Sequence, residues 1–357
     1  MSECSRDMKR ILIICAKFAA AALVTLVCFE VYFRTTEISL PSFVIDDPVL
    51  GRAFKPNARS ALIQEGFYMG RINKYGGLGP AYAPERTEGA LRVALVGDSY
   101  VEAFQVFPKW NLRSVLEEEL SSRTGRRVEV LNFGLSGQNI RTMYAYYKDQ
   151  VTRFQPDITL FIVVDDSFFG RDKKKGPLCY IDEDGNLEVN YDFAKSDMYQ
   201  RKMRLRFTRE LGSFQMLQAA FARYQLGETP QIVLDKFAPR KSVKKRESPE
   251  SEATDPNFRL NKAVIEEFGR LNRSGSSRIM FVGHKEVPPY YLPVIAETGL
   301  TYIDLRPELD EFQRSVTDPY YWPVTHSRGH WNQEGQRFIG NYLAGRLCEL
   351  MDQKTTR

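Results

Sequence analysis

Histidine and cysteine, two of the side chains that most often bind metals, are scarce in this chain of 357 residues. The three histidines and five cysteines are His284, His326, His330, Cys4, Cys15, Cys28, Cys179 and Cys348. No two cysteines form a CxxC motif, so the spacing typical of a structural zinc site is missing. We therefore expect no metal and no cofactor, and any histidine base must come from a choice of three.

The sequence also lacks a strong excess of charge and the common phosphate-binding motifs. Its 50 basic and 45 acidic residues give a formal net charge of +5, an ordinary balance that offers no case for nucleic acid. Neither GxGxxG nor GxxxxGKS/T occurs. Hydrophobic residues make up 43% of the chain, enough to bury a sizeable core.

One long apolar run lies near the N-terminus, at residues 11–33 (ILIICAKFAAAALVTLVCFEVYF). A helix of that length spans roughly 35 Å, enough for the hydrocarbon core of about 30 Å. Three basic residues, Arg6, Lys9 and Arg10, precede it, whereas Arg34 alone follows closely. The positive-inside rule then predicts a single-pass anchor in the inner (cell) membrane, with residues 1–10 cytoplasmic and the body extracytoplasmic, or periplasmic. A cleaved signal peptide is the alternative, although no A-x-A site follows the run.

Beyond this segment, residues 34–90 are rich in proline and glycine and predict an extended lead-in with short strands. Apolar runs and amphipathic stretches then alternate through residues 91–357, apart from a charged insertion at about 171–258. The insertion contains an Asp184-Gly185 hairpin signal, a helical pattern at 197–225 and a polar stretch at 241–255. Strands are predicted at 92–96, 127–131, 158–164, 278–283 and 301–305. Helices are predicted at 109–123, 138–154, 259–273, 288–298 and 333–350. The alternation predicts the α/β class, as a three-layer α/β/α sandwich with a mostly parallel sheet.

A Gly-Asp-Ser tripeptide, residues 97–99, follows the first buried strand of this domain. Ligands of open α/β sheets bind beyond the carboxyl ends of the strands, so Ser99 is expected to face the cleft. Gly97 allows the chain to turn there, and Asp98 can hold the turn by accepting backbone N–H groups. Such a serine needs a base to become a nucleophile. His330 lies on a loop before the last helix, with Asn332 as a predicted N-cap, while His326 and His284 remain competitors.

Four motifs in this order resemble the SGNH/GDSL hydrolase family. They are GDS after the first strand, NFGLSG at 132–137, PD before the strand at 158–164, and HWN-x-x-G before the last helix. The lead-in stretches DDPVLGRAFKPN (46–57) and RINKYGGLG (71–79) resemble membrane-anchored members. The resemblance implies the flavodoxin-like fold of that family. It also implies that Ser99 is the nucleophile, that His330 is the base, and that the N–H groups of Ser99 and Gly137 bind the oxyanion.

The chain departs from the family pattern at two positions. The family has an oxyanion-binding asparagine after the third strand, where this chain has Asp165 and Asp166, and either could be the match. An ionised carboxylate cannot donate a hydrogen bond to an oxyanion, although a protonated one can. The family also has an aspartate two or three residues before the histidine, where this chain has Ser327 and Arg328. Asp318 is the candidate for that histidine-orienting acid, with Asp304 or the Asp165/Asp166 pair as alternatives.

The expected function is therefore that of a membrane-anchored, extracytoplasmic acyl-ester hydrolase or O-acyl (acetyl) transferase. The expected partner is an acylated glycan or another acyl ester, and the oligomeric state stays open. Aromatic residues near His330 offer a sugar-stacking surface or belong to the core; they are Tyr320, Tyr321, Trp322 and Trp331. The two departures favour an alternative, a catalytically degenerate SGNH-like protein that binds a glycan or an envelope-assembly partner.

Overall fold

The computed structural model describes residues 2–36, 43–63, 65–169, 176–206, 211–212, 251–275 and 277–355. The chain divides into two compact units, one of residues 1–42 and 201–245 and the other of residues 43–200 and 246–357. In the first unit, helix α1 (Ser2–Thr36) contains a 24-residue stretch, Arg10–Phe33, with a mean hydropathy of 2.5. None of that stretch is buried, and its length and composition suit either a membrane span or a signal sequence.

The second unit is built on a five-stranded sheet in which every neighbouring pair of strands is parallel. The strand order is β11-β10-β7-β5-β6. The strands are β5 (Leu91–Gly97), β6 (Val128–Gly134), β7 (Ile158–Val163), β10 (Arg278–Gly283) and β11 (Thr301–Asp304). All residues of β5, β6 and β7 are buried, as their continuous apolar runs predict for a sheet covered on both faces.

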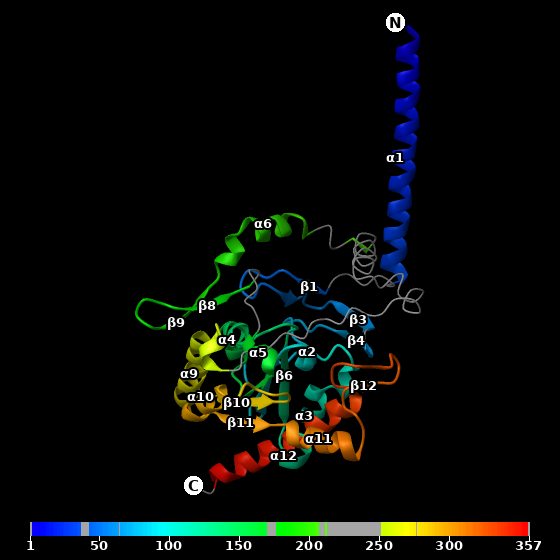
Figure 1. The fold of residues 1–357 in the computed structure, drawn as a ribbon. Coiled ribbons are helices and arrows are strands. Elements are labelled where there is room, and N and C mark those ends of the chain that lie inside the picture. The colour runs from blue at the N-terminus through cyan, green and yellow to red at the C-terminus, as the bar shows by residue number, and fades with distance from the viewer. Residues whose placement is uncertain are drawn as a thin grey trace. The chain divides into compact units, whose positions relative to one another are not determined.

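Helices cover both faces of this sheet (Figure 1). One face packs against α4 (Ile140–Asp149), α9 (Phe258–Ser274) and α10 (Tyr291–Glu297). The other face packs against α3 (Leu112–Thr124), α11 (Arg306–Ser315) and α12 (Gln333–Thr355). Successive residues of β5 alternate between the two cores, with Val93 and Leu95 on one side and Ala94 and Val96 on the other. The predicted three-layer α/β/α sandwich is confirmed, and its sheet is wholly parallel.

Several element boundaries differ from the sequence predictions. The helix expected at 138–154 ends as α4 at Asp149, and a separate 3-10 turn, η2 (Val151–Phe154), follows it. Helix α10 begins at Tyr291 because two prolines, Pro288 and Pro289, precede it. Helix α11 was not predicted, since only Leu309 of its residues is buried. A second short 3-10 turn, η1 (Pro108–Trp110), precedes α3.

Part of the predicted insertion lies within the described residues. The Asp184-Gly185 signal corresponds to the hairpin of β8 (Leu178–Ile181) and β9 (Leu187–Asn190), in which Gly185 has φ of 88°. The turn η3 (Asp192–Lys195) and helix α6 (Asp197–Arg204) follow it. Most of the remainder of the predicted 197–225 helix, and residues 241–250 of the polar stretch, lie outside the described residues. The turn η5 (Glu252–Thr254) leads back to α9.

The lead-in forms two small antiparallel hairpins on the α/β domain. The first pairs β1 (Val44–Ile45) with β2 (Ala53–Phe54), and the second pairs β3 (Arg59–Ile63) with β4 (Phe67–Arg71). Phe54, Tyr68, Ile72 and Leu78 are buried in the same core cluster as the sheet. Because these side chains belong to the core of the domain, the lead-in is a structural part of it.

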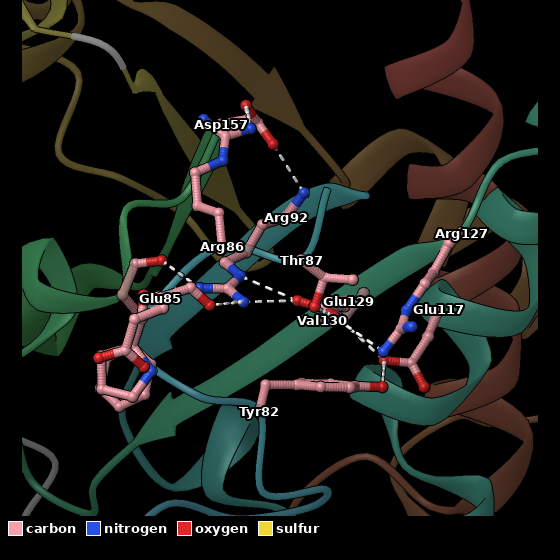
Figure 2. A network of polar contacts seen from close by, with 12 residues as sticks. Tyr82, Glu85, Arg86, Thr87, Arg92, Glu117, Arg127, Glu129, Val130 and Asp157 are labelled. Atoms are coloured by element: carbon pink, nitrogen blue, oxygen red, sulfur yellow. Dashed lines mark hydrogen bonds and ion pairs between the residues drawn. The ribbon is translucent and has the colours of Figure 1, made fainter. Parts of the chain in front are cut away.

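A buried ion pair joins the end of the lead-in to the start of the sheet (Figure 2). The Arg92 guanidinium lies 2.6 Å from the Glu129 carboxylate, and both side chains are 1% exposed. Arg92 also donates to the backbone oxygens of Pro84, Glu85 and Phe154. The guanidinium thereby holds the chain that enters β5 against the neighbouring strand β6.

Candidate active site

Ser99 begins α2 (Ser99–Glu102), directly after β5. The side chain of Asp98 caps this short helix by accepting from the backbone N–H of Tyr100 at 3.0 Å. A Cβ on Gly97 would come 2.5 Å from a Val101 methyl, so a residue without a side chain fits the turn. In this strand order, the chain crosses from one side of β5 to the other after β6. Ser99 therefore lies at the topological switch point, where open α/β sheets bind ligands.

His330 lies just before α12, and its Nε2 atom is 2.7 Å from the Ser99 hydroxyl. The Trp322 indole N–H donates to the backbone oxygen of His330 at 2.9 Å and holds this loop. The Asn332 side chain accepts from the Gly335 N–H at 2.9 Å, which caps the first turn of α12. The Tyr100 ring packs 4.7 Å from the imidazole, between centroids. The structure thus brings together Ser99 and His330, which are 231 positions apart in the sequence.

Glu65, in the turn between β3 and β4, faces the other ring nitrogen of His330. Its two carboxylate oxygens lie 3.0 and 2.9 Å from Nδ1, and one also accepts from the His330 backbone N–H at 2.8 Å. Nδ1 must carry a proton to donate to this carboxylate, which leaves Nε2 as the acceptor for the Ser99 hydroxyl. Ser99, His330 and Glu65 therefore form a continuous serine–histidine–carboxylate chain.

Two glycines make room for this contact. A Cβ on Gly329 would come 2.1 Å from a Glu65 carboxylate oxygen, and a Cβ on Gly66 would come 2.2 Å from the Trp322 ring. Burial pushes the pKa of the Glu65 carboxyl upward. The hydrogen bonds and charge of His330 outweigh that effect and hold the pKa below its ordinary value. These contacts therefore favour the ionised form of Glu65.

The prediction that Asp318 orients the histidine is wrong. The Asp318 carboxylate binds the Arg328 guanidinium at 3.2 Å and the Tyr320 N–H at 3.0 Å, while Glu65 occupies the place beside Nδ1. Asp304 is also committed elsewhere, since it pairs with Arg306 at 2.7 Å. No pattern in the sequence distinguished Glu65, because it lies 265 positions before the histidine on a turn of the lead-in.

The expected oxyanion residues lie on the loops after β6 and β7. Gly137 has φ of 74°, a conformation that favours glycine, and its N–H has no hydrogen-bond partner within the described part of the chain. Asp165 and Asp166 begin α5 (Asp165–Phe169), where Asp165 is half-buried and Asp166 exposed. Burial raises the pKa of Asp98, and the charge of Asp166 adds to that effect. Asp166 therefore lies close enough to Asp98 to act on its carboxyl electrostatically.

The two competing histidines have other surroundings. His284 is 2% exposed, and neither ring nitrogen has a hydrogen-bond partner within the described residues. Burial holds its pKa well below the ordinary value, so it is a neutral ring packed against Tyr100 and Trp331. His326 has φ of 49°, and its Nδ1 atom lies 3.4 Å from the Tyr321 hydroxyl. Of the three histidines, His330 is the one that meets Ser99.

The aromatic residues near His330 belong mainly to the core. Trp331 is fully buried, and Trp322 is 7% exposed beneath the His330 loop. Of the four, Tyr321 is the most open, at 39% exposed. A stacking surface made by all four residues is therefore excluded. A surface depression of about 630 Å³ adjoins the site and is lined by Glu65, Tyr100, Lys285, Tyr320 and His330 among others.

Among the described residues, no group of three or more His, Cys, Asp or Glu side chains is arranged to hold a metal ion. Cys15, Cys28, Cys179 and Cys348 form no disulfide within the part of the chain that the structure describes.

No family model matches the chain, and no curated protein matches it in sequence. Among solved structures, a protein from Desulfitobacterium hafniense assigned to the G-D-S-L family of lipolytic proteins is similar at 11% identity, over 71% of this chain and 98% of that chain, with a TM-score of 0.38. An acetyl xylan esterase is similar at 12% identity, over 71% and 98% of the two chains, with a TM-score of 0.39. A lipase/acylhydrolase from Enterococcus faecalis is similar at 14% identity, over 72% and 94%, with a TM-score of 0.37.

Proposed function

We propose that this chain is a serine acyl-ester enzyme of the SGNH/GDSL type, with Ser99 as nucleophile, His330 as base and Glu65 as the acid that orients the histidine. The observation that carries the proposal is the hydrogen-bonded chain from the Ser99 hydroxyl through both ring nitrogens of His330 to the Glu65 carboxylate. A lone serine or histidine at a loop has many structural explanations, whereas this arrangement supplies each part that serine activation needs.

The geometry suggests the following steps. His330 Nε2 takes the hydroxyl proton as Ser99 Oγ bonds to the acyl carbon, and the carbonyl oxygen becomes an oxyanion. Glu65 stabilises the imidazolium that forms, and the N–H groups of Ser99 and Gly137 donate to the oxyanion. The tetrahedral intermediate then collapses, His330 gives its proton to the leaving alcohol, and an acyl-serine remains. Water, or the hydroxyl of an acceptor, attacks this ester with His330 again as base, which releases the acyl group and restores Ser99.

We further infer that the substrate is an O-acyl group, acetyl in the first instance, on an extracytoplasmic glycan. The basic residues before the apolar run of α1 favour an anchor that leaves the body outside the cytoplasm. The depression beside His330 is open and partly aromatic, since Tyr100 and Tyr320 contribute to its wall. Hydrolysis and transfer share the first half-reaction, which forms the acyl-serine. They differ in whether water or the hydroxyl of an acceptor then takes the acyl group.

The decisive experiment compares Ser99→Ala with the matched control Ser122→Ala, an exposed serine on α3. Full-length protein in detergent is assayed with p-nitrophenyl acetate and is labelled with a fluorophosphonate probe. We expect Ser99→Ala to lose a factor of about 10⁴ to 10⁶ in kcat and all labelling, while the control retains both. Acetylated glycan fragments, with and without an acceptor sugar, then separate hydrolysis from transfer. An unchanged rate in Ser99→Ala would remove this serine from the mechanism, and a wild-type protein that neither turns over nor labels would favour the non-catalytic binding protein.

A further inference from the structure

A second carboxylate, Glu102, lies in the same short helix as Ser99 and is 4% exposed. It accepts hydrogen bonds from both the backbone N–H and the hydroxyl of Ser136, the former at 3.3 Å. Ser136 directly precedes Gly137, whose N–H is the proposed oxyanion donor. The helix that carries the nucleophile therefore also holds the residue next to the oxyanion glycine.

Arg52, which comes from the lead-in, completes this contact. Its Nη2 atom lies 3.8 Å from a Glu102 carboxylate oxygen, and its Nη1 atom donates to the Ser136 backbone oxygen at 3.4 Å. Burial raises the pKa of the Glu102 carboxyl, whereas the Ser136 hydrogen bonds and the Arg52 charge act in the opposite direction. The N–H, the hydroxyl and the carbonyl of Ser136 are thus all bound by one carboxylate–guanidinium pair.

Other contacts join β5 and α2 to β6 and to the first residue of the loop that follows it, Leu135, but they lie before Ser136. Asn132 donates to the Val101 backbone oxygen at 2.7 Å, and the Leu135 N–H donates to Gly97 at 3.0 Å. A Cβ on Gly134 would come 2.1 Å from the Glu102 nitrogen, so the two backbones touch there. These contacts fix the loop up to residue 135. The next residue, which sets the direction of the Gly137 N–H, is held by Glu102 and Arg52.

We propose that Glu102 and Arg52 are positioning residues that aim the Gly137 N–H at the oxyanion. The inference rests on the proposed function and adds a role that the Ser99–His330–Glu65 chain does not supply. The side chains of Glu102 and Arg52 contact Ser136 and not the reacting atoms, so their effect on the reaction passes through Ser136. An oxyanion exists in the transition state and not in the bound ester, so loss of this contact lowers kcat and leaves KM nearly unchanged.

The test uses Glu102→Gln, Arg52→Met and Arg52→Lys, with Glu118→Gln on the exposed face of α3 as the control. Kinetics with p-nitrophenyl acetate and the melting temperature are measured for each full-length variant. We expect Glu102→Gln and Arg52→Met to lower kcat by about 10- to 100-fold, less than the loss of a whole oxyanion donor, with KM within about threefold. Arg52→Lys should recover part of the rate because it keeps the charge beside Glu102. The Glu102→Gln/Arg52→Met double variant should be little worse than the poorer single variant, since both act on one contact.

Folded Glu102→Gln and Arg52→Met variants with wild-type kcat would overturn the inference, as would a loss confined to KM. If Glu102→Gln fails to fold, the Arg52 variants decide, because the Arg52 side chain is 42% exposed and its replacement disturbs the core less. Failure of the proposed function has a different signature, since the wild-type protein would then show no turnover that depends on Ser99.

Discussion

The carboxylate of Glu65 binds both the ring Nδ1 and the backbone N–H of His330, which lies 265 positions later in the chain. Two attachments to one residue fix the position of the histidine and also the rotation of its imidazole. Glu65 belongs to the lead-in hairpin, whereas Ser99 and His330 belong to the α/β domain. The lead-in therefore supplies the carboxylate that lies beside His330.

Exchange of Glu65 for glutamine should reduce turnover strongly. The neutral amide no longer stabilises an imidazolium, and it can hold the ring in the wrong tautomer. We expect kcat for p-nitrophenyl acetate to fall by about 10³ to 10⁴ in Glu65→Gln, with the Michaelis constant changed little. The matched control is Asp318→Asn, which removes the acid expected from sequence and should stay within about threefold of wild type, as expected for a surface pair with Arg328. The reverse ranking of these two variants would assign the orienting role to Asp318.

A single methyl group at residue 329 should disrupt the contact between Glu65 and His330. The added Cβ of Gly329→Ala would lie 2.1 Å from the Glu65 carboxylate, so the acid has to move away from the imidazole. We expect a fall in kcat of about 10² or more, approaching that of Glu65→Gln, with a folded protein by circular dichroism. Gly345→Ala on α12 is the control, since its Cβ would meet no atom closer than 3.8 Å. Equal rates in both glycine variants would show that Glu65 does not need its present position.

Asparagine at the acidic pair after β7 should increase the rate of ester cleavage. An amide can donate to the oxyanion, whereas an ionised carboxylate repels it. One of the two variants, Asp165→Asn or Asp166→Asn, places an amide where it faces the oxyanion, and that variant should raise kcat by about 10-fold or more. One oxyanion donor is typically worth a factor of about 10² to 10³ in kcat. The other substitution serves as the control. A decrease in both variants would mean that the carboxylates have a role of their own, which substrates with a cationic acyl group would reveal.

Loss of one partner of the buried Arg92–Glu129 pair should destabilise the fold. Figure 2 shows the Glu129 carboxylate between Arg92, Thr87 and Arg127, so loss of Arg92 leaves this buried carboxylate without its buried cation. We expect Arg92→Met to lower the free energy of unfolding by about 3 to 5 kcal/mol in urea titrations. The Arg92→Met/Glu129→Met double variant should recover part of this loss, because no buried charge of the pair then remains, and the Arg127 side chain is exposed to solvent. A single variant as stable as wild type would contradict this account.

Acid should remove the stabilisation that Glu129 provides. Burial raises the pKa of the Glu129 carboxyl. The hydrogen bonds from Thr87 and Arg92 and the charges of Arg92 and Arg127 lower it by more than burial raises it, so the folded pKa lies below the ordinary value. A carboxyl with a depressed folded pKa contributes stability above its unfolded pKa of about 4.3, and this is lost as the pH falls through the folded value. The difference in unfolding free energy between wild type and Glu129→Gln should therefore shrink from pH 7 to pH 3. A difference that stays constant over that range would exclude this linkage.

The fold followed from local patterns in the sequence. Continuous apolar runs such as residues 158–164 predicted buried parallel strands, and amphipathic stretches predicted the helices that cover them, because these patterns depend on near neighbours. The GDS turn was found in the same way, whereas the resemblance to the SGNH/GDSL family favoured His330 over His326 and His284. Helix α11 was missed because Leu309 is its one buried residue, so it carries little apolar pattern. Most of the insertion also carries no periodic pattern.

The sequence by itself determined the α/β class, the apolar N-terminal segment and the candidate Ser99, since each depends on residue types and short spacings, and its resemblance to the SGNH/GDSL family added His330. The tertiary structure alone decided which acid lies beside Nδ1 of His330. A carboxylate can reach an imidazole from any element that packs against the histidine. The sequence therefore offered no reason to prefer Glu65 over Asp318. The distinction arises because the lead-in packs its aromatic side chains into the domain core, which carries the β3–β4 turn to His330, while Asp318 is held by Arg328.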